Sequence, residues 1–184
     1  DTAFNISPNN KINKTKEEYT KAESHHQNDN VKHDSKSQIK INNKVIELYH
    51  SSQAIEGSVA EHYLKIHRNI VGALPKDLRF IENAYDPVTK TNQAALASFA
   101  RNSSGEVSAV QLTYLDKNTN NKLKINEQPH DCVKRSFGNI KGAFVEIQKN
   151  ADSNQNHPIY VAEGVETALS IKEVGVKGTI VASL

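Results

Sequence analysis

The sequence is poor in residue types that mark several classes of protein. A single cysteine, Cys132, excludes an internal disulfide and favours a reducing, cytoplasmic setting. No apolar run is long enough to cross a membrane, and no signal-peptide pattern opens the chain, so we expect no membrane partner. Methionine is absent, even at position 1, which indicates a piece of a longer polypeptide or a processed product.

Strong charge of one sign is also missing. The formal net charge is +2, so global electrostatics do not require a nucleic-acid partner, and such binding must come from a local patch. Only 36% of the 184 residues are hydrophobic, so part of the chain is expected to remain outside any core. Residues 1–37, rich in Asn, Lys, Ser, Asp and His, are predicted to be a disordered polar linker from a preceding domain.

Helices and then antiparallel strands are expected over residues 38–150. Apolar spacing predicts a short helix over Lys44–Gln53, and Ser58 with Glu61 forms a capping box that starts a second helix ending at Gly72. Polar turns then separate strands whose residues alternate, as in Val110–Tyr114, which predicts an antiparallel meander with one buried and one wetter face.

The stretch 126–142 is predicted to be a loop that leads into a strand at Ala143–Ile147. It contains Lys134, Arg135 and Lys141 beside two glycines. Flexible backbone next to cations suits contacts with phosphates, although a solvated loop with ordinary surface lysines fits the same pattern.

The C-terminal stretch 158–184 has the most definite pattern. Ile159–Ala162 is a branched apolar run of the kind that forms strands buried on both faces, Gly164 permits a turn, and apolar spacing predicts a helix over Val165–Val174. A further strand at Thr179–Ala182 completes a strand, helix, strand unit. The expected fold is α/β, or α+β overall, in which the meander and the N-terminal helices lead into the start of a parallel sheet.

Glu163 ends the first strand of that unit. Ligands of open α/β sheets bind outside the carboxyl ends of the strands, and a carboxylate placed there suits Mg²⁺. The alternative is that Glu163 only favours the helix behind it through the helix dipole.

The motif around Glu163 resembles a known family. Val161–Ser170 reads Val-Ala-Glu-Gly-Val-Glu-Thr-Ala-Leu-Ser and is similar to the first motif of the Toprim domain, in the branch found in phage and plasmid primases and as a C-terminal module of conjugative relaxases. The resemblance implies that Glu163 takes part in metal-dependent catalysis with a later Asp-x-Asp motif. That motif is absent before Leu184, so 158–184 is expected to be the first unit of a truncated Toprim domain.

Three earlier segments carry the same resemblance. Ala54–Leu64 and Leu78–Phe80 are similar to elements that precede the Toprim core in plasmid-type primases, which makes Arg79 a candidate phosphate contact or a structural partner of a carboxylate. The Lys134–Ala143 segment is similar to a lysine and glycine element of that family, which implies DNA contacts by Lys134, Arg135 and Lys141.

The resemblance therefore implies a DNA-processing module of the primase or conjugative-transfer type. It is expected to use Mg²⁺ for nucleotidyl or phosphoryl transfer in the intact protein, to bind single-stranded or primer-template DNA and nucleotides, and to adjoin other domains of a larger protein. The alternative is a non-catalytic truncated module that binds DNA or a protein partner. A third class, an unrelated nucleotide-binding domain, lacks support because the sequence has no P-loop and no Gly-x-Gly-x-x-Gly.

Overall fold

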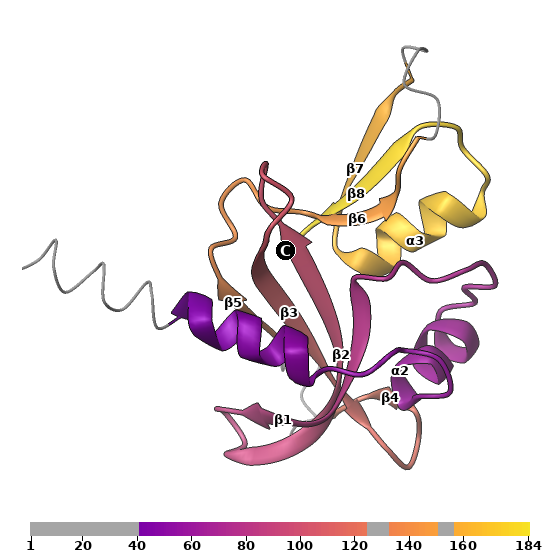
Figure 1. Cartoon of the computed structure of the whole chain (residues 1–184). Helices are drawn as coiled ribbons and strands as arrows, with labels where there is room; N and C mark the ends of the chain where they lie inside the picture. Colours follow the sequence, from indigo (N-terminus) through magenta and orange to yellow (C-terminus); the bar gives the residue numbers. More distant parts are fainter. Residues whose placement is uncertain (1–40, 125–132, 151–156) are drawn as a thin grey trace, which may run out of the picture. The chain divides into compact units, whose positions relative to one another are not determined.

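The computed structural model describes residues 41–124, 133–150 and 157–184, which belong to one compact unit (Figure 1). The predicted linker 1–37, the linker histidines and Cys132 lie outside the described residues. No helix of the described part is both long and apolar enough to cross a membrane.

The larger sheet is an antiparallel meander, as predicted. Within the described residues its strands follow the order β1-β2-β3, and both β4 and β5 pair with β3. The strands are β1 (Leu78–Asp86), β2 (Thr91–Arg101), β3 (Val107–Asp116), β4 (Asn121–Lys122) and β5 (Lys134–Gly138).

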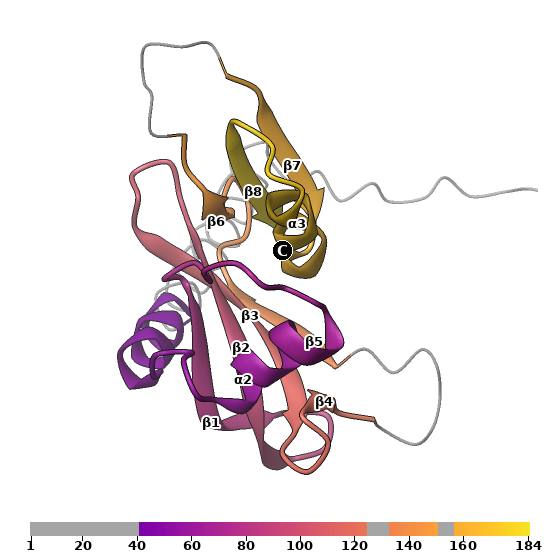
Figure 2. The same ribbon diagram turned by 90° about the vertical axis from the view of Figure 1, so that its right-hand side faces the viewer.

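Both faces of this sheet are covered (Figure 2). A helix of residues 41–51 lies on one face, and α2 (Val59–His62) and the π-helix η1 (Tyr63–His67) lie on the other, where the core continues to α3 (Val165–Glu173) of the smaller sheet. The predicted wetter face of β3 is therefore wrong: Leu112 is buried on one side, and Thr113, only 2% exposed, is buried on the other.

The helix predicted over Lys44–Gln53 is observed over residues 41–51, whereas the second helix begins after Ser58 as predicted but ends earlier than Gly72. The helix of residues 41–51 buries Val45 at its centre. The Ser58 Oγ accepts the Glu61 N–H at 3.3 Å, while the Glu61 carboxylate accepts the N–H of Gly57, not that of Ser58. The second helix ends at His67 as a π-turn and not at Gly72, because Asn69 already has a positive φ of 55°.

The smaller sheet contains the C-terminal strand, helix, strand unit. Its strands are β6 (Val145–Gln148), β7 (Ile159–Glu163) and β8 (Thr179–Ser183), in the order β6-β8-β7. β7 and β8 are parallel and joined by α3, as predicted, whereas β6 is antiparallel to β8. The fold class is thus α+β, with one parallel strand pair in the described part. β6 belongs to the predicted region 38–150 but pairs with β8 of the predicted region 158–184. The division of the chain into these two regions stays a prediction.

The prediction that Ile159–Ala162 is buried on both faces is wrong. Ala162 is buried beneath α3, but Ile159 and Val161 are 69% and 70% exposed on the opposite face. The reason is that α3 covers only one face of this sheet within the described residues.

The predicted loop 126–142 contains a strand. β5 pairs with β3 from Thr113 opposite Lys134 to Ala109 opposite Gly138, so Lys134 and Arg135 have fixed strand positions. Lys141 lies in the turn that follows and is exposed.

Candidate nucleic-acid interface

Glu163 lies at the carboxyl end of the parallel strand pair, opposite Ser183 of β8. Gly164 follows with a φ of 88°, a conformation that favours glycine, and its N–H donates to the Ser183 carbonyl oxygen at 3.3 Å. The Glu163 side chain is exposed and forms no hydrogen bond or ion pair with any residue that the structure describes. Its carboxylate is therefore available to an incoming group.

Glu166, in the first turn of α3, occupies the opposite kind of environment. Its side chain is 14% exposed, and its carboxylate oxygens lie 2.7 Å from the Lys134 Nζ and 3.0 Å from the Lys122 Nζ. The Tyr63 hydroxyl donates a third bond at 3.1 Å. One carboxylate thus connects β4, β5, η1 and α3.

Arg68 extends this arrangement towards the surface. Its Nε donates to the Tyr63 hydroxyl oxygen at 2.8 Å, and its guanidinium lies 5.5 Å from the centre of the Tyr63 ring. The Lys122 ammonium lies 5.9 Å from the same ring, which suits a cation–π contact. We call Tyr63, Arg68, Lys122, Lys134 and Glu166 the junction cluster.

The junction cluster carries three cations and one carboxylate. Burial alone would raise the pKa of the Glu166 carboxyl, but the hydrogen bond and charge of Lys134, with the charge of Lys122, lower it to about 2. Burial and the charge of Glu166 raise the pKa of Tyr63 above its ordinary range, so its hydroxyl stays protonated and donates. Positive charge exceeds negative charge here at neutral pH, which favours an anionic ligand.

The junction cluster adjoins both Glu163 and an open pocket. The Lys134 Nζ lies 3.8 Å from the point that a Cβ on Gly164 would occupy, so the structure brings Lys134 to the turn after Glu163. The pocket is lined by His67, Arg68, Asn69, Glu166, Thr167 and Ser170. Two residues that the sequence singled out separately therefore meet at one place.

The other predicted DNA contacts lie elsewhere. Arg135 forms an ion pair with the fully buried Asp86 at 3.8 Å. The Arg79 Nε donates to the Ser52 Oγ, and its Nη2 donates to the Ser52 carbonyl oxygen at 2.7 Å. Arg79 thus has a structural partner, a serine where a carboxylate was the expected alternative. Phosphate contacts by Arg79, Arg135 and Lys141 stay predictions.

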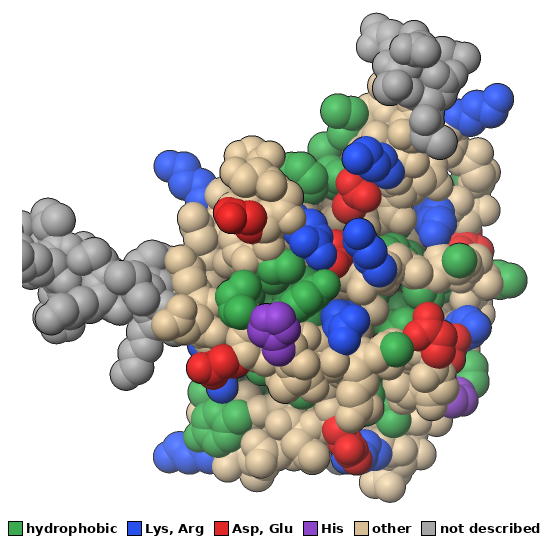
Figure 3. Space-filling model, viewed as in Figure 1, with side chains coloured by type: hydrophobic (Ala, Val, Ile, Leu, Met, Phe, Trp, Pro, Cys, Tyr) green, Lys and Arg blue, Asp and Glu red, His purple; other side chains and the backbone are tan. Residues whose placement is uncertain are grey.

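The charged surface agrees with a local rather than a global basic site. On the face drawn in Figure 3, acidic side chains stand among the lysines and arginines of the described residues, with no large area of one sign.

The described residues do not fit Mg²⁺ by themselves. Among them, no three His, Cys, Asp or Glu side chains gather as a metal site. Glu163 offers one carboxylate, and the oxygens of Glu166 are already engaged by Lys122, Lys134 and Tyr63. A magnesium site would need further oxygen ligands.

The sequence did not identify most of the junction cluster. Tyr63 lies in the segment Ala54–Leu64 but was not a candidate site residue, and Arg68 and Lys122 carried no signal because they lie far from Glu166 in sequence. Two signals pointed to this place: Lys134 was a candidate DNA contact, and Glu166 lies within the stretch Val161–Ser170, three residues after Glu163.

The fold places this chain among the α+β proteins, and a comparison with family models identifies its family. The model for "Domain of unknown function (DUF7146)" matches residues 40–147, more than half of the chain. The chain belongs to this family. The match ends within β6, so β7, α3 and β8 lie beyond it. No curated protein and no solved structure matches the chain significantly.

Proposed function

We propose that this chain is a DNA-processing module of the primase or conjugative-transfer type, which holds DNA phosphates at the junction cluster beside Glu163. One observation carries the proposal: an exposed carboxylate without a partner stands at the carboxyl end of a parallel strand pair, next to Lys134 and two further cations. Cations position nucleic acid through its phosphates without reading bases.

The finer fold assignment belongs to the same proposal. The order strand, Glu-Gly, helix, parallel strand in β7, α3 and β8 agrees with the start of a Toprim domain. In the intact protein, we propose that further acidic ligands join Glu163 to bind Mg²⁺, which would stabilise charge on phosphate oxygens. The residues of this chain supply phosphate contacts and one carboxylate.

The alternative is a non-catalytic module that binds DNA or a protein partner. It is favoured by the engagement of Glu166 in three contacts, which leaves Glu163 as the one carboxylate without a partner at the junction in the described part.

DNA binding tests both versions. Fluorescence anisotropy of the 184-residue chain with single-stranded and primer-template oligonucleotides should show binding that weakens as salt rises. Arg68→Gln should weaken binding about three- to tenfold, since one phosphate contact is lost. The matched control is Lys177→Gln. Lys177 is exposed and precedes β8, at the end of that strand opposite to Ser183 and Glu163, so its replacement should leave the affinity for DNA unchanged.

Metal dependence separates the two versions. Mg²⁺-dependent primer synthesis or strand cleavage that is abolished by Glu163→Ala would support the catalytic version. DNA binding that neither Mg²⁺ nor Glu163→Ala changes would support the binding module. Absence of DNA binding at low salt would rule out the catalytic version and leave only the protein-binding form of the alternative.

A further inference from the structure

A second cavity lies on the other face of the larger sheet, away from the junction cluster. It has a volume of about 310 Å³, in the lower range of ligand pockets in proteins. Its walls come from the helix of residues 41–51, from β1, β3 and β5, and from the β1–β2 turn; the lining residues are Lys44, Leu48, Ser51, Ile81, Asn83, Ala84, Tyr85, Pro87, Leu112 and Phe137. We call this cavity the helix pocket.

The helix pocket results from how one helix crosses the sheet. Val45 and Tyr49 pack into the core, while Lys44, Leu48 and Ser51, at spacings of four and three, form the neighbouring stripe that faces the pocket. Beneath them the β1–β2 register shifts between Ile81 and Ala84. The helix does not cover the end of β1 after this shift, where Asn83 and Tyr85 are exposed and line the pocket.

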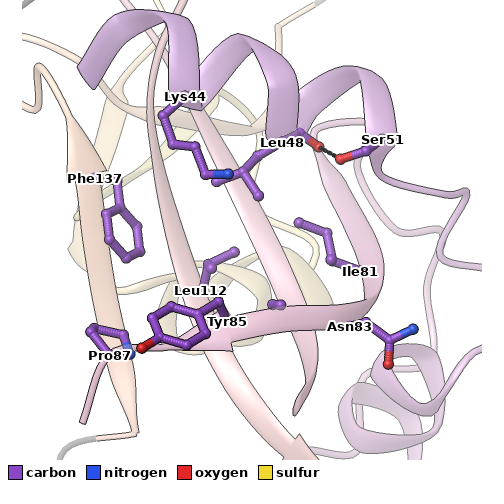
Figure 4. A pocket seen from close by; sticks show the side chains of 10 residues that line it. Lys44, Leu48, Ser51, Ile81, Asn83, Tyr85, Pro87, Leu112 and Phe137 are labelled. Carbon is purple, nitrogen blue, oxygen red and sulfur yellow. Dashed lines mark hydrogen bonds between the residues drawn. The ribbon is translucent and has the colours of Figure 1, made fainter. Parts of the chain in front are cut away.

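The lining is apolar apart from its rim. Figure 4 shows Phe137 and Ile81 on opposite sides, Tyr85 and Pro87 along one edge, and Lys44 lying over the pocket from the helix. The Ser51 hydroxyl already donates to the Leu48 carbonyl oxygen. The cavity therefore suits an apolar or aromatic body.

Lys44 supplies the one charged group of the lining. Its only ion pair in the described residues is with Glu47 at 3.8 Å, and the two side chains are 63% and 69% exposed. Exposed pairs of this kind are weak, so the ammonium can turn to a ligand anion.

We propose that the helix pocket binds a small organic carboxylate with an apolar, ring-sized body, its carboxylate paired with Lys44. A nucleobase fits less well, because its polar edges would be buried against Leu48, Ile81 and Leu112 without partners. The proposal is independent of DNA binding at the junction cluster, since the two sites lie on opposite faces of the sheet.

The test uses 2-naphthoate and its neutral analogue 2-naphthamide, titrated into the 184-residue chain by calorimetry. We expect naphthoate to bind with a Kd of about 1 mM or tighter, as its size allows, and the amide to bind about tenfold more weakly. Lys44→Gln should remove this difference, and Lys177→Gln should preserve it.

A second pair of variants tests the cavity itself. Ser51→Phe places a ring in the pocket from the exposed rim and should abolish binding of both compounds, whereas Ser51→Ala should retain it; circular dichroism confirms that each variant is folded. Failure of naphthoate to bind, or equal binding by Ser51→Phe, would overturn the proposal. Displacement of naphthoate by single-stranded DNA, with DNA affinity lost in Lys44→Gln, would show that a base occupies the pocket instead.

Discussion

Glu166 is the side chain that holds the junction cluster together. Its carboxylate receives Lys122, Lys134 and the Tyr63 hydroxyl, from three separate elements. A charge so buried is stable only while its partners remain, so the ionisation of Glu166 is linked to folding.

Replacement of Glu166 by Gln should make stability less sensitive to acid. The folded pKa of about 2 lies below the ordinary value of 4.5, so the stabilisation is complete above pH 4.5 and is lost as the pH falls towards 2. One pKa unit corresponds to about 1.4 kcal/mol, so the effect is up to about 3 kcal/mol. Urea unfolding of both proteins between pH 7 and pH 2 measures it.

The comparison has an internal control. Glu82, which is 56% exposed and paired with Lys117 at 3.3 Å, should leave the acid sensitivity almost unchanged when it is replaced by Gln. Equal acid sensitivity of the wild-type chain and Glu166→Gln would contradict the assigned role of Glu166.

Arg79 is predicted to contribute to stability, whether or not it also contacts phosphate. Its guanidinium donates to Ser52 and lies 5.4 Å from the centre of the Tyr49 ring, which ties β1 to the helix of residues 41–51. Arg79→Gln should lower the free energy of unfolding by about 1–3 kcal/mol, since bonds to charged groups are the stronger ones. Chemical denaturation measures the loss, with exposed Lys141→Gln as the neutral comparison. An unchanged midpoint would show that the Ser52 contacts contribute nothing.

At the level of helices and strands, the sequence predicted those elements whose ends carry a local signal. α3 lies between Gly164 and Gly175, both with positive φ, and its predicted span exceeds the observed one by a single residue. β5 was missed because its two cations and short length read as a loop. Its pairing with β3 comes from Thr113 and its neighbours, about twenty residues earlier.

The junction cluster could not be predicted for the same physical reason. Tyr63 and Glu166 stand 103 residues apart, and only the packing of α3 against η1 brings them together. Glu163 could be placed because the carboxyl end of a strand is a local property of the sequence.

Gly138 tests the placement of β5. Its φ is 94°, and a Cβ there would lie 2.8 Å from the Ala109 Cα and from the Val45 Cγ2, besides meeting the Ser108 carbonyl oxygen. Gly138→Ala should lower stability by about 2–4 kcal/mol, through backbone strain and overpacking. Thermal or urea unfolding measures the change.

Gly142 offers a matched comparison. It also has a positive φ, 70°, but a Cβ there meets nothing within 4 Å, so Gly142→Ala should cost only about 1–2 kcal/mol. If the two variants were equally stable, the close approach of β5 to β3 and to the helix of residues 41–51 would be refuted.

For the described unit as a whole, the two sheets differ in how they are covered. The larger sheet has packing on both faces, whereas the smaller one exposes Ile159 and Val161, and β7 pairs only with β8 among the described strands. An apolar face beside an open strand edge favours self-association.

The double substitution Ile159→Thr, Val161→Thr should therefore reduce self-association with little loss of stability. Threonine keeps the β-branched shape, and changes at exposed sites usually alter stability by about 0.5 kcal/mol or less. Concentration-dependent light scattering measures association. Val181→Thr, at a position only 6% exposed on the adjacent strand, should instead destabilise the chain. A large stability loss in the double variant would mean that this face is covered.

The strand order of the smaller sheet also determines when this sheet can form during synthesis of the chain. β6 pairs with β8, whose last residue, Ser183, follows Gln148 by 35 residues, so β6 is synthesised before its partner. At about 5–20 residues per second, that delay lasts about 2–7 s. Until β8 has been made, β6 has no strand to pair with among those described in its sheet, so its pairing must be one of the last steps in folding of the described unit.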